Sequence, residues 1–284
     1  MKSVLDFPKA KSKNELISMV TCYDYTSARI VETTAIDCIL VGDSGSMTMH
    51  GFDSTLPATV EMMAAMTSSV RKGAPTKFIV ADMPFLAHRG SIDRTLEAAR
   101  MLMTAGAQAL KIEGVDGSED VLKHIVQSGV PVMGHLGLTP QSVHQFGGFK
   151  VQATSPEAQA MLLEQALKVE AAGAFALVLE CVPTNIAKIV TERLSIPTIG
   201  IGAGSGCAGQ VLVFQDLLGL NREFKPRFVR TYMDGFGVFQ EALNSFDKDV
   251  KTGAFPNEKE SFNPASDQGA HVKPKSTLAT ELST

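Results

Sequence analysis

Ionisable side chains recur at the ends of short apolar runs in this sequence. Lys111 and Glu113 end the stretch 105–113, and Glu180 ends a similar stretch, 172–180. Both stretches begin with Ala-Gly-Ala, the pattern of a helix that stops at glycine and is followed by a strand. The other members of the series are Asp43, Asp82 and His135. Such groups can ligate a hard cation or transfer a proton, so we take them as the candidate site.

Asp43, Asp82 and Glu113 supply three hard oxygen donors without the cysteine or histidine spacing of a zinc site. This donor set favours Mg²⁺ completed by water and an anionic ligand. The alternative for each carboxylate is that it caps a helix or faces solvent. Lys111 either neutralises Glu113 or binds a substrate carboxylate as a compact charge, and the two roles are compatible.

Glu180 follows an apolar strand, a setting that favours a carboxyl group able to act as a base near neutral pH. The alternative is a carboxylate held by a lysine or by backbone amides. Because a second base is unnecessary, we assign His135 to substrate orientation. Cys181 is interpreted as a packing residue rather than a nucleophile. The histidines expected on the surface are His50, His88, His124 and His144.

These groups must be positioned by a regular array of strands. Apolar runs alternate with helical patterns at residues 16–20, 38–41, 78–81, 110–113, 130–133, 176–179, 197–201 and 210–213. Eight strands alternating with helices predict a (β/α)₈ barrel in the α/β class, with a doubly wound open sheet as the alternative. Catalytic groups in such barrels lie at the C-terminal ends of the strands. Side chains alternate along a strand, so Lys111 and Glu113 should point the same way.

The composition restricts the class of protein. The chain has 284 residues, 44% hydrophobic and 20% charged, which is enough for a large core in one barrel domain over residues 1–262. A formal net charge of −4 gives no general attraction to nucleic acid or anionic membranes. No apolar run reaches the roughly 18 residues of a membrane span, and no signal peptide is recognised. We therefore expect a cytoplasmic protein that acts on small molecules, with its four cysteines reduced.

Three further segments carry predictions. Residues 45–59 are expected to form a long polar loop. A helical pattern is expected from Asn221, and its aromatic stripe should form core or a subunit interface; the stripe comprises Phe224, Phe228, Tyr232, Phe236 and Phe239. Residues 263–284 have no aromatic residues and many Ser, Thr, Pro and Lys, so we expect a disordered tail.

Several longer runs resemble one enzyme family. Val41-Gly-Asp-Ser-Gly-Ser-Met-Thr-Met-His-Gly51 and Gly134-His-Leu-Gly-Leu-Thr-Pro-Gln-Ser142 are similar to segments of the ketopantoate hydroxymethyltransferases. Shorter similar runs are Ala81-Asp-Met-Pro-Phe85, Lys111-Ile-Glu-Gly114, Leu179-Glu-Cys-Val-Pro183 and Ile199-Gly-Ile-Gly-Ala-Gly204. The resemblance extends in unbroken order over residues 17–262.

The resemblance implies a TIM barrel of the phosphoenolpyruvate/pyruvate type that transfers a hydroxymethyl group. The donor would be 5,10-methylenetetrahydrofolate and the acceptor 3-methyl-2-oxobutanoate, giving 2-dehydropantoate for pantothenate and coenzyme A synthesis through a Mg²⁺-stabilised enolate. Asp43 and Asp82 would be metal ligands and Glu113 a partner in the metal shell. Ser44 and Lys111 would hold the oxo acid, and Glu180 would be the base. The family often assembles as a homo-oligomer, commonly a decamer.

The sequence departs from the family beside Ser44. The family usually has a larger apolar residue and then glycine, whereas this chain has Gly45 and then Ser46. We expect the greater backbone freedom of Gly45 to alter this loop.

Two other functions are considered. One is a carbon–carbon lyase of the phosphoenolpyruvate/isocitrate-lyase type, and the other is a barrel that lost activity and serves as an assembly or ligand-binding protein. The lyases typically carry a Lys-x-Cys-Gly-His run, which is absent here, and the second reading is disfavoured because the groups for enolate chemistry are present.

Overall fold

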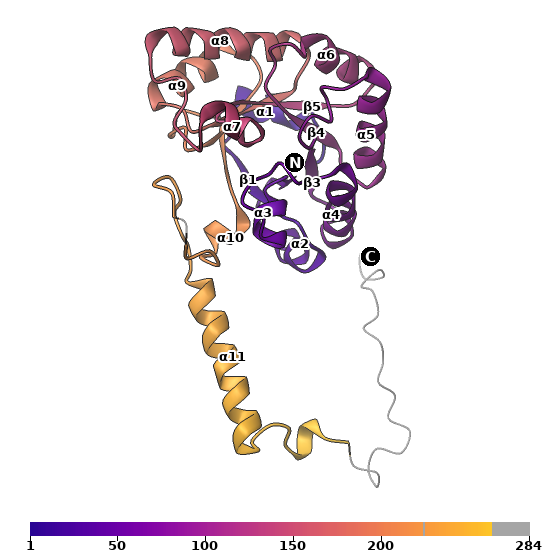
Figure 1. The fold of residues 1–284 in the computed structure, drawn as a ribbon, viewed down its shortest axis with the longest axis vertical. Coiled ribbons are helices and arrows are strands. Elements are labelled where there is room, and N and C mark those ends of the chain that lie inside the picture. Colours follow the sequence, from indigo (N-terminus) through magenta and orange to yellow (C-terminus); the bar gives the residue numbers. More distant parts are fainter. Residues whose placement is uncertain (224, 263–284) are drawn as a thin grey trace. The chain divides into compact units, whose positions relative to one another are not determined.

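Eight parallel strands close into a barrel (Figure 1). The structure is a computed structural model and describes residues 1–223 and 225–262. The strands are β1 (Ile17–Thr21), β2 (Cys38–Val41), β3 (Phe78–Asp82), β4 (Ala109–Glu113), β5 (Val132–Gly137), β6 (Ala176–Glu180), β7 (Thr198–Ile201) and β8 (Gly209–Leu212). Each strand pairs with the next and β8 pairs with β1, so the predicted barrel is confirmed and the open sheet is excluded.

Helices surround this barrel and connect its strands (Figure 1). The connections contain α2 (Tyr25–Glu32), α3 (Gly45–His50), α4 (Val60–Gly73), α5 (Ile92–Thr104), α6 (Glu119–Gln127), η1 (Pro140–Ser142), α7 (Val143–Phe146), α8 (Pro156–Ala171) and α9 (Thr184–Arg193). The link 202–208 between β7 and β8 contains no helix. The short helix α10 (Phe214–Leu217) follows β8.

The two-residue period of the strands decides which side chains enter the barrel. In β4, Ala109 belongs to the interior cluster, whereas Leu110 and Ile112 pack outwards against the helices. Lys111 and Glu113 share the face of Ala109, as the alternation predicts. The same period carries Phe78, Val80 and then Asp82 into the interior along β3, and Met133 and then His135 along β5. The apolar residues fill the barrel and the ionisable ones follow towards its C-terminal end.

An N-terminal helix that the sequence did not predict covers the other end of the barrel. This helix, α1 (Asp6–Ser12), buries Phe7 completely. The Phe7 ring meets Phe78 with its centroid 5.2 Å away and Phe175 at 4.9 Å, both in edge-to-face geometry. Such aromatic pairs add favourable energy beyond the burial of apolar area. The interior is therefore plugged on this side, and its ionisable groups are reached from the opposite mouth.

Three predictions about local structure differ from what the structure shows. The expected loop 45–59 begins with helix α3, which ends where Gly51 adopts a φ of 73°. The expected helix from Asn221 begins only at Gly235, because Pro226 interrupts the preceding segment and Asp234 caps the helix by accepting a hydrogen bond from the Gly237 amide. The fifth strand also continues past its predicted end, so His135 lies within β5.

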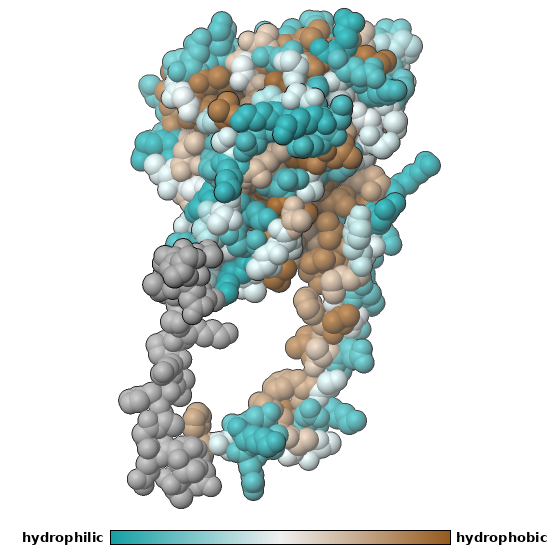
Figure 2. Space-filling view, turned by 180° about the vertical axis from the view of Figure 1, so that it is seen from behind, coloured by the Kyte–Doolittle hydropathy of each residue, from teal (hydrophilic) through white to brown (hydrophobic). Residues whose placement is uncertain are grey.

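The chain divides into two units, Met1–Met233 and Asp234–Thr284. The second unit contains α11 (Gly235–Thr252) and η2 (Glu258–Glu260), and the tail 263–284 lies outside the described residues, as does Phe224. Hydrophobic side chains are visible along α11 in Figure 2. The aromatic stripe is exposed rather than core: Phe228 is 37% exposed, Tyr232 65%, Phe236 42% and Phe239 57%. No helix in the described ranges combines the length and apolarity needed to cross a bilayer.

Candidate active site

The ends of five neighbouring strands, β2 to β6, bring ionisable side chains together inside the C-terminal mouth of the barrel. Lys111 is central to the cluster: its Nζ lies 3.1 Å from Asp82 Oδ1 and 3.7 Å from Glu113 Oε1. Asp82, Lys111 and Glu113 are each at most 5% exposed. The ammonium therefore neutralises both carboxylates, which is one of the two roles predicted for Lys111. The sequence had correctly predicted that Lys111 and Glu113 share one face of β4.

His135 connects this buried group to Glu180. The imidazole Nδ1 lies 3.1 Å from Lys111 Nζ and 3.3 Å from Glu113 Oε1. On the other side of the ring, Nε2 lies 3.2 Å from Glu180 Oε2. The Glu180 side chain is 18% exposed, compared with 2% for His135. Glu180 is thus the member of this cluster that is most open to the barrel mouth.

Asp43 reaches the same cluster from the end of β2. Its amide donates a 3.0 Å hydrogen bond to Asp82 Oδ2. Its carboxylate accepts a 2.8 Å hydrogen bond at Oδ2 from the side-chain amide of Gln141. Gln141 and Tyr23 are two residues of this region that sequence reasoning had not assigned. Both lie within the range 17–262 that resembles the family, but an uncharged side chain gives no signal of the kind used for the carboxylates.

The charges in this cluster perturb one another. Burial, followed by the negative charges of Asp82 and Glu113, raises the pKa of Asp43 well above its ordinary value. Burial also raises the pKa of Asp82, although Lys111 opposes this shift. For Glu113, the contacts with His135 and Lys111 outweigh burial and lower its pKa. Three carboxyl groups thus share one lysine ammonium, which pairs with Asp82 and Glu113 and makes no ion pair with Asp43 among the described residues.

The donor chemistry fits a divalent cation held mainly by Asp43 and Asp82. Asp82 Oδ1 is buried and receives no well-aligned hydrogen bond from the described residues, although the Lys111 ammonium is near. Hard carboxylate oxygens suit Mg²⁺. In the described part of the chain, no three acidic, histidine or cysteine side chains are grouped to ligate one ion. Glu113, which faces Lys111, His135 and the Gln141 amide, therefore fits an outer position reached through water.

Ser44 contacts Tyr23 rather than any carboxylate of the cluster. The Tyr23 hydroxyl and Ser44 Oγ are 2.9 Å apart. Next to them, a Cβ on Gly45 would come within 2.8 Å of both Tyr23 Cδ1 and Met66 Sδ. Gly45 is thus required by close packing, not by an unusual φ. Ser46 Oγ donates to the carbonyls of Asp43 and Ser54, which fixes the loop that departs from the family pattern.

The cysteines are free and do not take part in the cluster. Cys22, Cys38 and Cys207 are buried, and Cys181 is partly exposed. Burial, with the charge of Glu180 in second place, raises the pKa of Cys181 to about 12. A thiol with such a pKa is protonated near neutral pH and is a poor nucleophile. This agrees with the packing interpretation of Cys181.

One of the histidines expected on the surface is buried. His88 is 3% exposed, whereas His50, His124 and His144 are exposed. Arg89 Nε donates a 2.9 Å hydrogen bond to His88 Nε2. Burial, reinforced by the positive charge of Arg89, lowers the pKa of His88 from its ordinary 6.5 to about 4. The folded protein therefore holds His88 neutral.

His88 is expected to make the folded state sensitive to mild acid. As the pH falls below 6.5, the unfolded chain binds a proton at this imidazole while the folded chain stays neutral until about pH 4. The wild type should lose about 2 kcal/mol more unfolding free energy than His88→Gln between pH 7 and pH 5. Urea denaturation of both proteins at each pH measures this difference. Parallel stability profiles would contradict the assignment.

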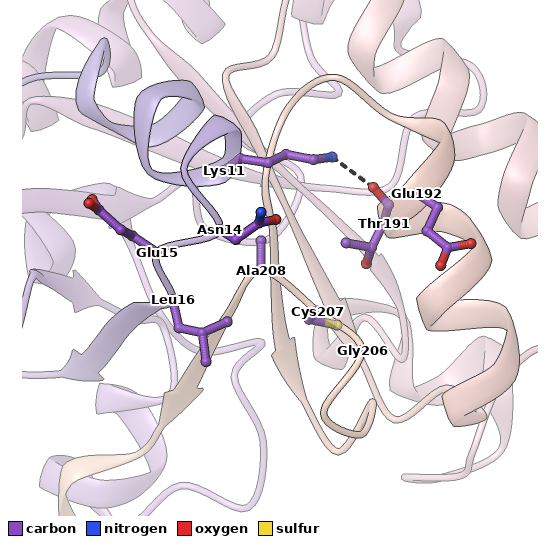
Figure 3. Close-up of a pocket in the computed structure, with 9 residues that line it drawn as sticks. All are labelled: Lys11, Asn14, Glu15, Leu16, Thr191, Glu192, Gly206, Cys207 and Ala208. Atoms are coloured by element: carbon purple, nitrogen blue, oxygen red, sulfur yellow. Dashed lines mark hydrogen bonds between the residues drawn. The ribbon is translucent and has the colours of Figure 1, made fainter.

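A cavity of about 320 Å³ lies at the N-terminal end of the barrel (Figure 3). Its lining includes Leu16 just before β1, Ala208 just before β8 and Thr191 of α9. Lys11 Nζ points across to α9 and donates 2.7 Å to the Thr191 carbonyl, and also donates to the carbonyls of Leu194 and Ile196. This amine is occupied by the chain itself, and the ionisable cluster lies at the other end. We therefore place the candidate active site at the C-terminal mouth.

Comparisons with known proteins agree with this geometry. The ketopantoate hydroxymethyltransferase family matches residues 2–258. A relative from Francisella tularensis subsp. novicida, named 3-methyl-2-oxobutanoate hydroxymethyltransferase, is 54% identical over 263 residues, covering 93% of this chain and 99% of the relative.

Solved structures resemble the barrel at much lower identity. A 2,3-dimethylmalate lyase, described as a PEP mutase/isocitrate lyase superfamily member, has a TM-score of 0.58 at 14% identity and covers 93% of each chain. A phosphonopyruvate hydrolase complex with oxalate and Mg²⁺ has a TM-score of 0.59 at 11% identity, covering 92% of this chain and 93% of that one. These likenesses show the fold alone, and they agree with the predicted TIM barrel.

The sequence matches decide the family. The matched range 2–258 includes every member of the ionisable cluster from Asp43 to Glu180. The relative shares more than half of its residues over nearly its full length. The chain therefore belongs to the ketopantoate hydroxymethyltransferase family.

Proposed function

We propose that the chain transfers a hydroxymethyl group from 5,10-methylenetetrahydrofolate to 3-methyl-2-oxobutanoate, giving 2-dehydropantoate. The name of the 54% identical relative supports this reaction. The observation that carries the proposal is the contact between Glu180 and the buried His135–Glu113–Lys111 group. It provides a base beside a buried group of charged side chains at the barrel mouth, as removal of a proton next to a carbonyl requires.

Glu180 takes the C3 proton of the oxo acid in this proposal. His135 fixes one oxygen of the base from 3.2 Å away, and its own ring is held by Lys111 and Glu113. Carbon 3 then forms a bond to the methylene carbon of the folate as the bond from that carbon to one folate nitrogen breaks. The oxygen of a water molecule replaces the second nitrogen on the same carbon. The C3 proton and one proton of the water pass to the two nitrogens, and tetrahydrofolate is released. The fixed Glu180–His135 contact orients the base before substrate arrives.

In this proposal Asp43 and Asp82 would hold Mg²⁺, and Glu113 would contact it through water. When bound, the ion would supply positive charge that favours removal of the C3 hydrogen. Ser44 and Lys111 hold the oxo acid, and His135 orients it together with the base. The hydrogen bond from the Asp43 amide to Asp82 Oδ2, which brings the ends of β2 and β3 together, supports the choice of these two carboxylates.

Metal removal tests the proposed function directly. Proton NMR of 3-methyl-2-oxobutanoate in D₂O should show loss of the C3 proton signal with enzyme and Mg²⁺, and no enzyme-dependent loss with EDTA. The exchange reports enolisation separately from folate turnover. If no exchange occurs with Mg²⁺, either alone or with added tetrahydrofolate, the proposed reaction is wrong.

The resemblance to the family also bears on the assembly and the location of the protein. We propose a homo-oligomer, with a decamer as the assembly that the resemblance implies, and a cytoplasmic location. The exposed aromatic residues Phe236 and Phe239 support an interface role for α11.

A further inference from the structure

Gln141 joins three strand ends of the candidate site. Its side-chain Nε2 donates 2.8 Å to Asp43 Oδ2 and 2.9 Å to the Met83 carbonyl, directly after Asp82. Its backbone amide donates 3.0 Å to Glu113 Oε2. The residue is 6% exposed. One residue of the loop after β5 thus contacts the ends of β2, β3 and β4.

The geometry fixes the Gln141 amide in one orientation. Two acceptors, a carboxylate oxygen and a carbonyl oxygen, lie at the same end of the amide, so its nitrogen must face them. Both amide hydrogens are used, which prevents rotation about the last side-chain bond. The Asp43 carboxylate is consequently held by one of its two oxygens, and Oδ1 is left for another ligand.

The loop that carries Gln141 is hydrogen-bonded to the backbone of Glu180, the proposed base. Leu138 donates its amide hydrogen to the Glu180 carbonyl at 2.8 Å. Gly137 makes this approach possible, because it has a φ of 90° and a Cβ there would collide with the Glu180 carbonyl. Pro140 begins η1 and restricts the backbone next to Gln141. Gln141 is therefore rigidly placed relative to both ends of the cluster.

The Gln141 side chain carries no charge, and this affects how well Asp43 can bind a cation. A lysine or arginine in this place would hold Asp43 equally well but would cancel its charge. An amide orders the carboxylate and leaves the negative charge available, which favours binding of a divalent ion. We propose that Gln141 is a positioning residue that presents Asp43 to the divalent cation. This inference rests on the proposed function.

Mn²⁺ binding tests the proposal without relying on turnover. Electron paramagnetic resonance titration should show Mn²⁺ binding to Gln141→Leu about 10–100-fold more weakly than to wild type. The leucine keeps the volume and the backbone contact to Glu113 but removes both side-chain hydrogen bonds. Gln141→Met, which keeps the length of the side chain and has no hydrogen to donate, repeats the test if the leucine variant does not fold. Excess Mg²⁺ should restore C3 exchange in the folded variant, since the defect is in affinity.

Ser46→Ala is the matched control. It deletes buried hydrogen bonds to the carbonyls of Asp43 and Ser54 but leaves the Asp43 carboxylate contact intact. It should bind Mn²⁺ nearly as wild type does. Wild-type Mn²⁺ affinity in a folded Gln141 variant, or an equal loss in Ser46→Ala, overturns the positioning role. Absence of Mn²⁺ binding by the wild type would instead overturn the proposed metal site itself.

Discussion

Replacing Glu180 with glutamine is expected to slow Mg²⁺-dependent exchange of the C3 hydrogen by about 10²–10⁴-fold, the usual contribution of a positioned base. The amide has the shape of the carboxylate but cannot accept the proton. Glu180 ends β6 and is the most open member of the cluster, with 18% of its side chain exposed. Its partner His135 is buried on the far side and cannot reach the mouth equally well. The NMR exchange assay in D₂O measures the effect.

Two controls separate loss of the base from damage to the site. Mn²⁺ affinity of Glu180→Gln should stay within a few-fold of wild type, because Glu180 contacts neither Asp43 nor Asp82 in the structure. Glu164→Gln, on the exposed surface of α8, should exchange the C3 hydrogen at the wild-type rate. If Glu180→Gln also exchanges at that rate, another group is the base, and His135 is the next candidate because it lies 3.2 Å from Glu180.

The grouping of Lys111, Glu113 and His135 could be predicted because regular strands impose a period of two on their side chains. The periodic apolar residues of β4 place Lys111 and Glu113 on the face of Ala109, and the parallel register sets Glu113 beside His135. The barrel then brings the strand ends to one mouth. These inferences need only local patterns and one rule of topology.

Features that depend on long-range contacts could not be predicted. Gln141 meets Asp43 across 98 residues of sequence, and nothing in its local pattern distinguishes it from a solvated glutamine. The burial of His88 beside Arg89 likewise depends on the packing of a loop, not on periodicity. Helix α1 is short, and it is stabilised by the contact of Phe7 with Phe78 and Phe175, which its own sequence does not reveal. Tertiary packing overrides weak local preferences at these places.

Replacing Lys111 with methionine is expected to lower the free energy of unfolding by about 3–5 kcal/mol at pH 8 in the presence of EDTA. The substitution removes the ammonium that lies 3.1 Å from Asp82 and 3.7 Å from Glu113, and it leaves their carboxylates buried without that counter-charge. Urea denaturation of the two proteins measures the loss. Mg²⁺ should recover part of it, since an ion bound to the folded state stabilises that state.

The stability loss caused by Lys111→Met should be smaller in acid. Lys111 acts to lower the pKa of Asp82 and of Glu113, so its removal raises both values in the folded state. A folded state that binds protons more readily than the unfolded chain gains stability as the pH falls, and the deficit of Lys111→Met should be smaller at pH 5 than at pH 8.

Lys168→Met is the matched control, because the Lys168 ammonium also meets carboxylates, those of Asp116, Glu119 and Glu164, but on the surface. Water and salt screen this second set, so its loss should be much smaller and nearly independent of pH. Equal losses in the two variants would contradict the central role of burial. A large loss of unfolding free energy confined to Lys111→Met would mean that the Lys111 ammonium stabilises the buried carboxylates in the metal-free folded state.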